Sequence, residues 1–155
     1  MKLITDFTEY QILDLNNGKK LESWNGIILN RPDPQVIWKK EEDTNWQKAD
    51  AIYDRSNTGG GKWNIKKNIP SSWVINYHDL KFNLKLMGFK HTGLFPEQAY
   101  NWNLIREKIK TAKREIKVLN LFAYTGAATI AALKEGASVV HVDSSRGMID
   151  WAKEN

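Results

Sequence analysis

Short segments of alternating hydrophobic and polar residues fill the chain up to about residue 95. Over residues 81–86, Phe82 and Leu84 alternate with lysine and asparagine, which places apolar side chains on one face of a strand. The segment YQILDL at 10–15 is followed by NNG at 16–18, a combination typical of a tight hairpin turn. The pattern predicts a β-rich N-terminal domain or lead-in over residues 1–95.

Turn-forming residues divide this region into the elements that we expect. Residues 35–40 (QVIWKK) are predicted as a strand, and residues 73–89 as two strands with a turn near 78–79. The stretch RPDP at 31–34 is predicted as a loop. The glycine-rich stretch at 55–63 lacks the spacing of a phosphate-binding loop, so we interpret it as a hairpin loop.

The hydrophobic period changes to that of a helix after residue 95. Pro96 suits the first helical position, and Glu97 beside it suits the first turn. The apolar residues that share one helical face are Trp102, Ile105, Ile109 and Ala112. We therefore predict a helix from Pro96 to about Arg114.

The stretch VLNLFAYTGAATIAALKEGASVVHVDSS, residues 118–145, carries the strongest pattern in the chain. An apolar strand stops at a turn that contains Gly126, and an alanine-rich helix follows and ends at Gly136. A second apolar strand then delivers Asp143 at its carboxyl end. This order predicts an α/β fold, in which residues 96–155 hold a connecting helix and the first βαβ unit of an incomplete, Rossmann-like doubly wound sheet.

The βαβ pattern brings groups that suit a nucleoside to the ends of the strands. Gly126 allows the backbone to turn sharply and to approach a ligand closely. The helix that follows directs its first N–H groups to the same place, which suits a carboxylate. Asp143 follows the turn at roughly the 20-residue distance at which a carboxylate binds a ribose diol.

A single glycine in FAYTGAAT distinguishes this turn from a dinucleotide site. Such sites carry three spaced glycines, because several backbone segments approach a pyrophosphate. One glycine favours a ligand without phosphates, and S-adenosylmethionine is such a ligand. Two alternatives stay open: a nicotinamide-dependent oxidoreductase with the same βαβ unit, and a non-enzymatic RNA-binding module in which the unit is only structural.

LNLFAYTGAAT at 119–129 resembles the first motif of class I S-adenosylmethionine-dependent methyltransferases. It is most similar to the group that resembles ribosomal-RNA large-subunit cytosine methyltransferases. The resemblance implies S-adenosylmethionine as cofactor and ribosomal RNA as substrate, with Asp143 accepting from the ribose hydroxyls and the 122–126 loop along the methionine end. The cofactor-binding residues that it predicts are Phe122, Ala123, Tyr124, Thr125, Gly126, Asp143, Ser144, Gln98 and Asn120.

Gln98 and Asn120 lie outside the glycine turn and follow from the same resemblance. Residues 84–102 are similar to the segment that precedes the cofactor domain in this group, where a glutamine lies near the cofactor. Asn120 stands where many class I methyltransferases carry an aspartate beside the cofactor's amino group, and it keeps an acceptor without the charge. Structural roles stay open for Tyr124, as cover for the strand end, and for Ser144, as a helix cap.

The chain is basic, with 23 Lys and Arg against 18 Asp and Glu, a net charge of +5 and a pI near 9.3. Basic residues adjoin tryptophans at 38–40 and 62–63, an arrangement that single-stranded RNA surfaces use. The alternative is a β module with tryptophans in its core and solvated lysines on its surface.

Several residue types and segments are missing from the sequence. There is no cysteine, which excludes disulfides, thiolate metal sites and a cysteine nucleophile of the cytosine-C5 type, and the three histidines lack the spacing of metal ligands. No membrane-spanning run or signal peptide is evident, so we expect a cytoplasmic protein. Because the chain stops in the helix after the second strand, we expect an N-terminal portion of a longer enzyme, with no catalytic residues and no turnover of its own.

Overall fold

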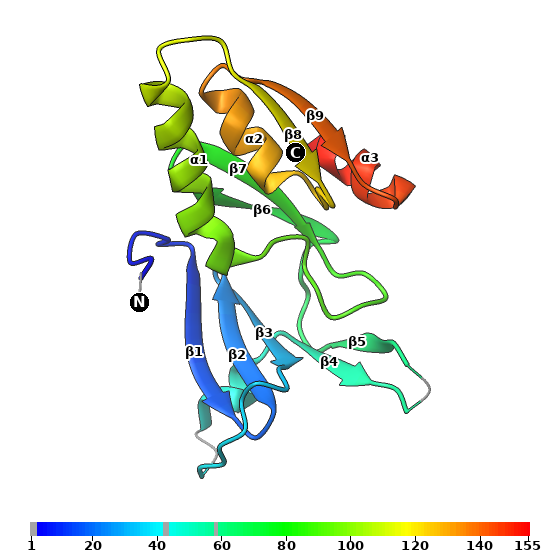
Figure 1. The fold of residues 1–155 in the computed structure, drawn as a ribbon. Coiled ribbons are helices and arrows are strands. Elements are labelled where there is room, and N and C mark those ends of the chain that lie inside the picture. Colours follow the sequence, from blue (N-terminus) through cyan, green and yellow to red (C-terminus); the bar gives the residue numbers. More distant parts are fainter. Residues whose placement is uncertain (1–2, 42–43, 58) are drawn as a thin grey trace. The chain divides into compact units, whose positions relative to one another are not determined.

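A computed structural model describes residues 3–41, 44–57 and 59–155 (Figure 1). The chain forms two compact units, and neither unit is one continuous stretch. The β-sheet unit contains residues 8–75 and 84–92, and the βαβ unit contains the described residues up to 7, residues 76–83 and residues 93–155. The division of the chain into domains at residues 95 and 96 stays a prediction.

Five strands form one sheet in the β-sheet unit. The elements are β1 (Tyr10–Asn16), β2 (Lys19–Trp24), β3 (Ile27–Pro32), the 3-10 helix η1 (Thr44–Lys48), β4 (Ala51–Arg55) and β5 (Gly61–Ile65). Neighbouring strands are antiparallel except β3 and β4, which are parallel. The predicted hairpin at 16–18 is confirmed, and Asn17 and Gly18 have the positive φ angles, 45° and 75°, of a tight turn.

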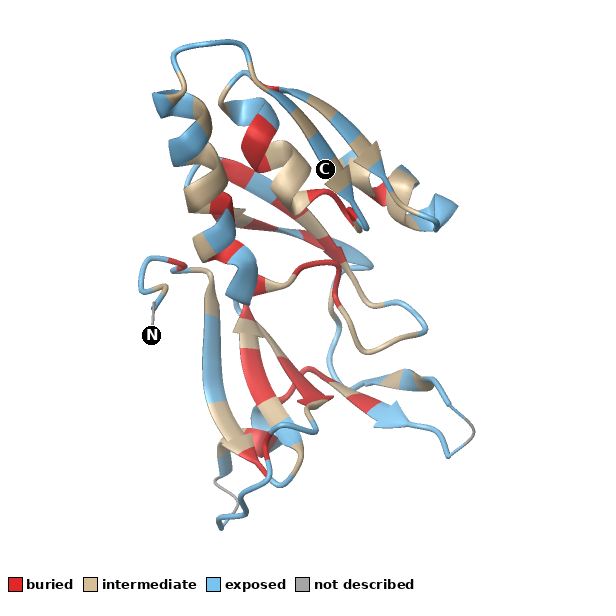
Figure 2. Ribbon diagram, viewed as in Figure 1, coloured by how far each residue is buried: buried red, intermediate tan, exposed pale blue. Residues whose placement is uncertain are grey.

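β2 and β3 carry several fully buried side chains of this unit (Figure 2). Leu21, Trp24 and Leu29 are fully buried, and so is the carboxylate of Glu22. Glu22 accepts hydrogen bonds from Arg31 Nε and Nη2 at 2.6 and 2.9 Å. Because Glu22 is paired with Leu29, Arg31 lies diagonally across the two strands on the same face.

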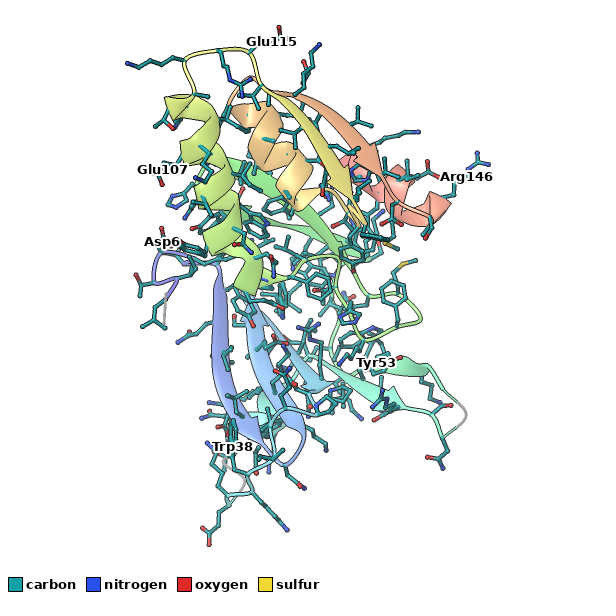
Figure 3. The ribbon with its side chains drawn as sticks, viewed as in Figure 1. Asp6, Trp38, Tyr53, Glu107, Glu115 and Arg146 are labelled. Carbon is teal, nitrogen blue, oxygen red and sulfur yellow. The ribbon has the colours of Figure 1, made fainter. Side chains whose placement is uncertain are left out.

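The prediction of a strand at residues 35–40 is wrong. These residues pass the β1–β2 turn, where Gly18 N donates to Val36 O at 2.7 Å and Asn17 N donates to Trp38 O at 2.8 Å. Figure 3 labels Trp38 in this segment. Contacts with a turn some 20 residues away thus decide the backbone conformation here, over the local propensity of the segment.

The loop predicted at 31–34 begins later than expected, because Arg31 and Pro32 belong to β3. The burial of the Arg31 guanidinium against Glu22 holds the strand in its register. The predicted hairpin loop at 55–63 joins β4 to β5, which are antiparallel; it is shorter than expected, since β5 begins at Gly61. Thr58 of this loop lies outside the described residues.

The second half of the chain alternates strands and helices. The elements are β6 (Ser72–Tyr77), β7 (Leu80–Lys85), the 3-10 helix η2 (Pro96–Gln98), α1 (Ala99–Thr111), β8 (Lys117–Leu121), α2 (Ala127–Lys134), β9 (Ser138–Val142) and α3 (Arg146–Glu154). β6 and β7 pair across the predicted turn at 78–79. The helix predicted from Pro96 is confirmed, with a 3-10 first turn and an end at Thr111, and α1 packs against α2 (Figure 1).

β8 and β9 are parallel neighbours connected through α2. This arrangement confirms the strand–helix–strand order predicted for residues 118–145 and the α/β fold. One face of this two-stranded sheet carries Asn120 and His141, and both contact Thr129 of α2. On the other face, Leu119 and Val140 are paired and remain 62% and 61% exposed. Parallel sheets are normally covered on both faces, so this apolar surface is unusual.

Candidate cofactor-binding site

The loop between β8 and α2, residues 122–126, has a strained backbone. Phe122, Tyr124 and Gly126 have φ angles of +54°, +52° and +88°. For an aromatic residue this left-handed conformation costs about 1–3 kcal/mol, and such outliers collect at functional sites. The strain marks this loop as a candidate site on structural grounds, independently of its sequence motif.

Gly126 is held against α3. A Cβ at this position would lie 3.1 Å from Ala152 Cβ and 3.6 Å from His141 Cε1, which is tighter than usual for the first contact. Gly126 therefore lies close to the protein's own helix α3, and its close approach to a ligand stays a prediction. Gly126 also begins α2 without a side-chain cap, so the first N–H groups of that helix are left to other acceptors.

A cavity of about 430 Å³ lies beside the loop, wholly within the βαβ unit. Its volume falls in the usual range for small-molecule sites, about 300–1,000 Å³. The predicted site residues that line it are Gln98, Asn120, Phe122, Ala123, Tyr124 and Thr125. Gly126, Asp143 and Ser144 do not line it.

Asp143 does not line the cavity but is hydrogen-bonded to Tyr124, which does. Its Oδ1 accepts from Ser145 N and its Oδ2 from Tyr124 N, each at 2.9 Å. These bonds, from Ser145 first and then Tyr124, hold the pKa of Asp143 below its ordinary value of 3.8. A carboxylate has about four acceptor positions, so the ionised group keeps positions for hydroxyl donors of a ligand.

Sequence reasoning missed the part of the wall that η2 and α1 provide. Phe95, Asn101, Trp102 and Ile105 line the cavity in addition to Gln98. Asn101 donates to Gln98 Oε1 at 2.8 Å, a bond between residues one helical turn apart. The three-residue spacing of these two amides indicates that they share one face of a helix. Nothing in the local sequence indicates that this face is directed at the 122–126 loop.

Thr125 links this loop to the segment before η2 and to the end of α3. Its hydroxyl donates to Gly93 O, and its carbonyl accepts from Asn155 Nδ2 at 2.8 Å. Gly93 is in turn held against Trp151, because a Cβ on Gly93 would lie 2.2 Å from the indole ring. Hydrogen bonds of Thr125 therefore connect the loop beside the cavity to the segment before η2 and to the residue that follows α3.

The aromatic and basic residues considered for RNA binding divide into two kinds. Trp38 is 49% exposed, and Lys40 pairs with Asp14. Trp63 is only partly exposed: it packs on the Tyr53 ring and donates to Phe89 O at 3.1 Å. Trp63 therefore has the structural role of the alternative interpretation, and Trp38 keeps a surface on which a base could stack.

Two kinds of feature are absent from the described part of the chain. No helix there is both long and apolar enough to cross a membrane. Among the same residues no group of three His, Cys, Asp or Glu side chains is placed to hold a metal ion.

Comparisons with known proteins bear on the identity of this site. Residues 55–155 match the family model of S-adenosylmethionine-dependent methyltransferases. The ribosomal RNA large subunit methyltransferases K/L of Shewanella frigidimarina and Pseudoalteromonas atlantica are 46% and 43% identical to the chain, over 83 and 76 residues. The crystal structure of a SAM-dependent methyltransferase from Agrobacterium tumefaciens aligns with a TM-score of 0.88 at 38% identity, over 94% of this chain.

The chain spans only part of these relatives. The aligned region amounts to 53% and 48% of the chain but to 11% and 10% of the two bacterial K/L proteins, and to 47% of the Agrobacterium protein. The matches agree with the predicted cofactor, S-adenosylmethionine, and favour neither the nicotinamide alternative nor the non-enzymatic one. Since the family model matches 101 of the 155 residues, the chain belongs to the S-adenosylmethionine-dependent methyltransferase family.

Proposed function

We propose that this chain forms the cofactor-binding part of a methyltransferase that acts on ribosomal RNA. The observation that carries the proposal is the strained 122–126 loop beside a cavity of suitable size, with the ionised Asp143 bonded to the loop. A cytoplasmic location belongs to the same proposal, since ribosomal RNA is modified where ribosomes are made.

The residues present fit S-adenosylmethionine in kind. Apolar and aromatic side chains such as Phe95 and Phe122 offer surface to the adenine or the methionine chain, and Gln98 and Asn120 offer amide groups. Asp143 accepts two backbone hydrogen bonds, and its remaining acceptor positions would take the two ribose hydroxyls. In this arrangement Phe122, Tyr124 and Gly126 would border the methionine end.

The bound cofactor would supply an electrophilic methyl group. The residues of this chain would hold and orient it, and correct orientation of two reactants contributes a large part of a bimolecular rate enhancement. Ribosomal RNA as the substrate is supported by the names of the K/L relatives and by the net charge of +5, which favours a polyanionic partner.

Calorimetric titration with S-adenosylhomocysteine tests the cofactor part, in the longest form of the protein that contains residues 1–155. We expect Asp143→Ala to weaken binding by about tenfold or more, because a charged acceptor for two hydroxyls is lost. Asp150→Ala is the matched control: it removes the same charge from a 57% exposed side chain on α3, and binding should be unchanged. Absence of binding by the folded protein would contradict the proposal, and tighter binding of NADH than of S-adenosylhomocysteine would favour an oxidoreductase.

The substrate part needs its own measurement. Labelled methyl groups from S-adenosylmethionine should appear in unmodified large-subunit ribosomal RNA and not in ribosomal protein. Labelling of protein alone would retain the cofactor site and overturn the RNA substrate.

A further inference from the structure

The loop at residues 86–91, which follows β7, is held on one face of the five-stranded sheet. Three successive carbonyl groups of the loop accept hydrogen bonds from side chains of three different strands: Gly88 O from the Tyr53 hydroxyl at 3.5 Å, Phe89 O from Trp63 Nε1 at 3.1 Å, and Lys90 O from Arg31 Nη1 at 3.0 Å. Lys85 N donates to Thr92 O at 3.2 Å and closes the base of the loop. Side chains of the sheet therefore fix the course of this loop through its carbonyl groups.

The register of the strands places cations and rings together on the sheet face that carries this loop. Arg31 of β3 shares the face with its partner Lys20 in β2 and with Tyr53 in β4. Trp63 is paired with Tyr53, and Arg55 follows Tyr53 by two positions, so both lie on the same face. Figure 3 labels Tyr53 of this group.

The two carboxylates beside these cations already have partners. Glu22 is paired with Arg31 and with Lys20, and Asp33 is paired with Lys20 at 3.5 Å. Burial lowers the pKa of Lys90 below its ordinary value of 10.5, and the neighbouring cations lower it further, although the charge of Asp33 opposes them. The carboxylates therefore do not balance the positive charge around Lys90.

Lys90 and Arg55 are the cations of this face that lack a carboxylate partner. Among the described residues, Lys90 Nζ donates only to Pro32 O, at 3.3 Å, and Arg55 forms no hydrogen bond or ion pair. An ammonium carries three donors and a guanidinium five. Most N–H groups of the two side chains are therefore available to an external anion.

Phe89 adds an aromatic ring beside Lys90. Its side chain is half-buried, and its ring centroid lies 6.4 Å from that of His91. Met87, in the same loop, is 42% exposed. Sites for single-stranded nucleic acid combine cations that bind phosphates with rings on which bases stack. A loop that is already held in place also loses little conformational freedom on binding.

We propose that the 86–91 loop and Arg55 bind single-stranded RNA, with Lys90 and Arg55 on phosphates and Phe89 against a base. The inference rests on the proposed function, because it assigns part of the contact with the RNA substrate to the β-sheet unit. An acidic protein would use the two cations but not the ring, and an RNA double helix would offer no unstacked base.

Removal of single charges tests the phosphate contacts in the longest form that contains residues 1–155. Lys90→Gln and Arg55→Gln should each weaken binding of a fluorescein-labelled single-stranded RNA of mixed sequence by about fivefold, measured by fluorescence anisotropy. Each should also reduce the slope of log affinity against log salt by about 0.7, the value for one phosphate of a single strand. Lys62→Gln is the matched control, since this exposed lysine is paired with Asp54 on the opposite face of the same hairpin and should change neither quantity. Equal losses in all three variants would show a general effect of net charge and overturn the inference.

Phe89→Leu tests the stacking contact separately. Leucine keeps an apolar side chain without the ring, so RNA binding should weaken by about fivefold or more. The salt slope should stay unchanged, because stacking releases no counterions. The same RNA annealed to its complement should bind less tightly and should not respond to Phe89→Leu. Equal affinity for the duplex, or no effect of Phe89→Leu on the single strand, would leave a general polyanion surface and overturn the inference.

Affinity for S-adenosylhomocysteine distinguishes a lost RNA contact from misfolding. It should be unchanged in Lys90→Gln, Arg55→Gln and Phe89→Leu, because these residues belong to the β-sheet unit and the cofactor cavity belongs to the βαβ unit. Lys90→Arg keeps the charge and Phe89→Tyr keeps the ring, so both should bind RNA within about twofold of the original protein. Failure of these two conservative variants to bind RNA would indicate a structural role of the loop and overturn the inference.

The same two ligands separate this inference from the proposed function. If the unaltered protein binds RNA and S-adenosylhomocysteine but Lys90→Gln, Arg55→Gln and Phe89→Leu bind RNA normally, the inference fails and the proposed function stands. If the unaltered protein binds S-adenosylhomocysteine but no RNA, the inference fails together with the RNA substrate, and the cofactor site stands. If it binds neither ligand, the whole proposed function fails as well.

Discussion

The strand pairs β2–β3 and β8–β9 differ in how far residues 1–155 bury their apolar side chains. Leu21 and Leu29 of the first pair are fully buried, whereas Leu119 and Val140 of the second are 62% and 61% exposed. Yet the second pair carries the motif from which the family can be recognised. The comparison teaches that the family signature lies on strands whose outer apolar side chains residues 1–155 do not cover.

Polar groups show the same contrast. The carboxylate of Glu22 is surrounded by partners from the protein: Arg31, Lys20 and the Tyr10 hydroxyl, which donates at 2.6 Å. Asp143 has two backbone partners and free acceptor positions. The β2–β3 pair uses its charges to hold the fold, and the β8–β9 pair keeps its charge available, as a ligand site requires.

The largest expected effect comes from breaking the closed network of the β2–β3 pair. Arg31→Met should lower the free energy of unfolding by about 3–5 kcal/mol, because it leaves Glu22 buried without its main partner. Urea unfolding measures this loss. The matched control, Lys20→Met, removes a charge 3.2 Å from the same carboxylate but from a half-buried side chain without the two-pronged bond of Arg31, and should cost less, about 1 kcal/mol. Equal losses in the two variants would contradict the assignment of Arg31 as the main partner.

Truncation of one leucine in each pair tests the difference in packing directly. Leu29→Ala should cost about 2–5 kcal/mol, because it opens a cavity at a fully buried position. Leu119→Ala in residues 1–155 should change stability by no more than about 0.5 kcal/mol, the usual range for a surface position. A large loss for Leu119→Ala in a longer form of the protein would show that another segment covers this sheet face there. A large loss in residues 1–155 would contradict the exposure described above.

Two glycines with a left-handed backbone conformation, Gly126 and Gly136, flank α2 in the βαβ unit. Gly126→Ala should cost about 1–3 kcal/mol from φ strain, plus the crowding of Ala152, and should also weaken binding of S-adenosylhomocysteine. Gly136→Ala carries similar strain, with φ +83°, but its Cβ would meet nothing within 4 Å. It should therefore be the less destabilised of the two and should bind ligand normally. Thermal unfolding and calorimetry together measure both effects, and equal behaviour of the two variants would remove the special role of the 122–126 turn.

Patterns that depend on neighbours in sequence predicted much of this structure. The NNG turn at 16–18, the helix after Pro96 and the βαβ unit with Gly126 and Asp143 are each encoded within a few residues or by a fixed spacing. Residues 35–40 were mispredicted because hydrogen bonds to a distant turn determine their backbone. Local alternation could not reveal that contact.

The site divides in the same way. The residues 122–125, which the motif predicts as cofactor-binding, line the cavity, and nothing in the motif indicates that Phe95, Asn101 and Trp102 line it too. The hydrogen bond between Thr129 and His141 joins residues 12 positions apart on α2 and β9, and no spacing rule predicts it. Pairings of this kind arise from tertiary packing, which a single sequence does not specify residue by residue.

The smallest expected effect concerns the acid dependence of the Glu22 network. Burial raises the pKa of Glu22, but the hydrogen bonds and charges of Arg31 and Lys20, with the Tyr10 hydroxyl, outweigh it and leave the pKa below its ordinary value of 4.5. The carboxylate therefore contributes stability above pH 4.5, and the contribution is lost as pH falls through the lowered value. One such group changes the unfolding free energy by at most about 1.4 kcal/mol per pH unit.

Arg31→Met should reverse the sign of this dependence. Without the guanidinium, we expect burial, the largest single effect on this group, to outweigh Lys20 and the Tyr10 hydroxyl and to raise the pKa of Glu22 above its ordinary value. The variant should then gain stability relative to the original protein as pH falls from 7 towards 4.5, since protonation relieves a buried and unpaired charge. Urea unfolding at several pH values measures the difference between the two proteins, and Glu22→Gln should remove the Glu22 contribution from both curves. If the difference in unfolding free energy does not change with pH, Lys20 and Tyr10 alone keep the carboxylate ionised. Arg31 would then not be the residue that closes the Glu22 network, and the contrast with Asp143 would lose its main support.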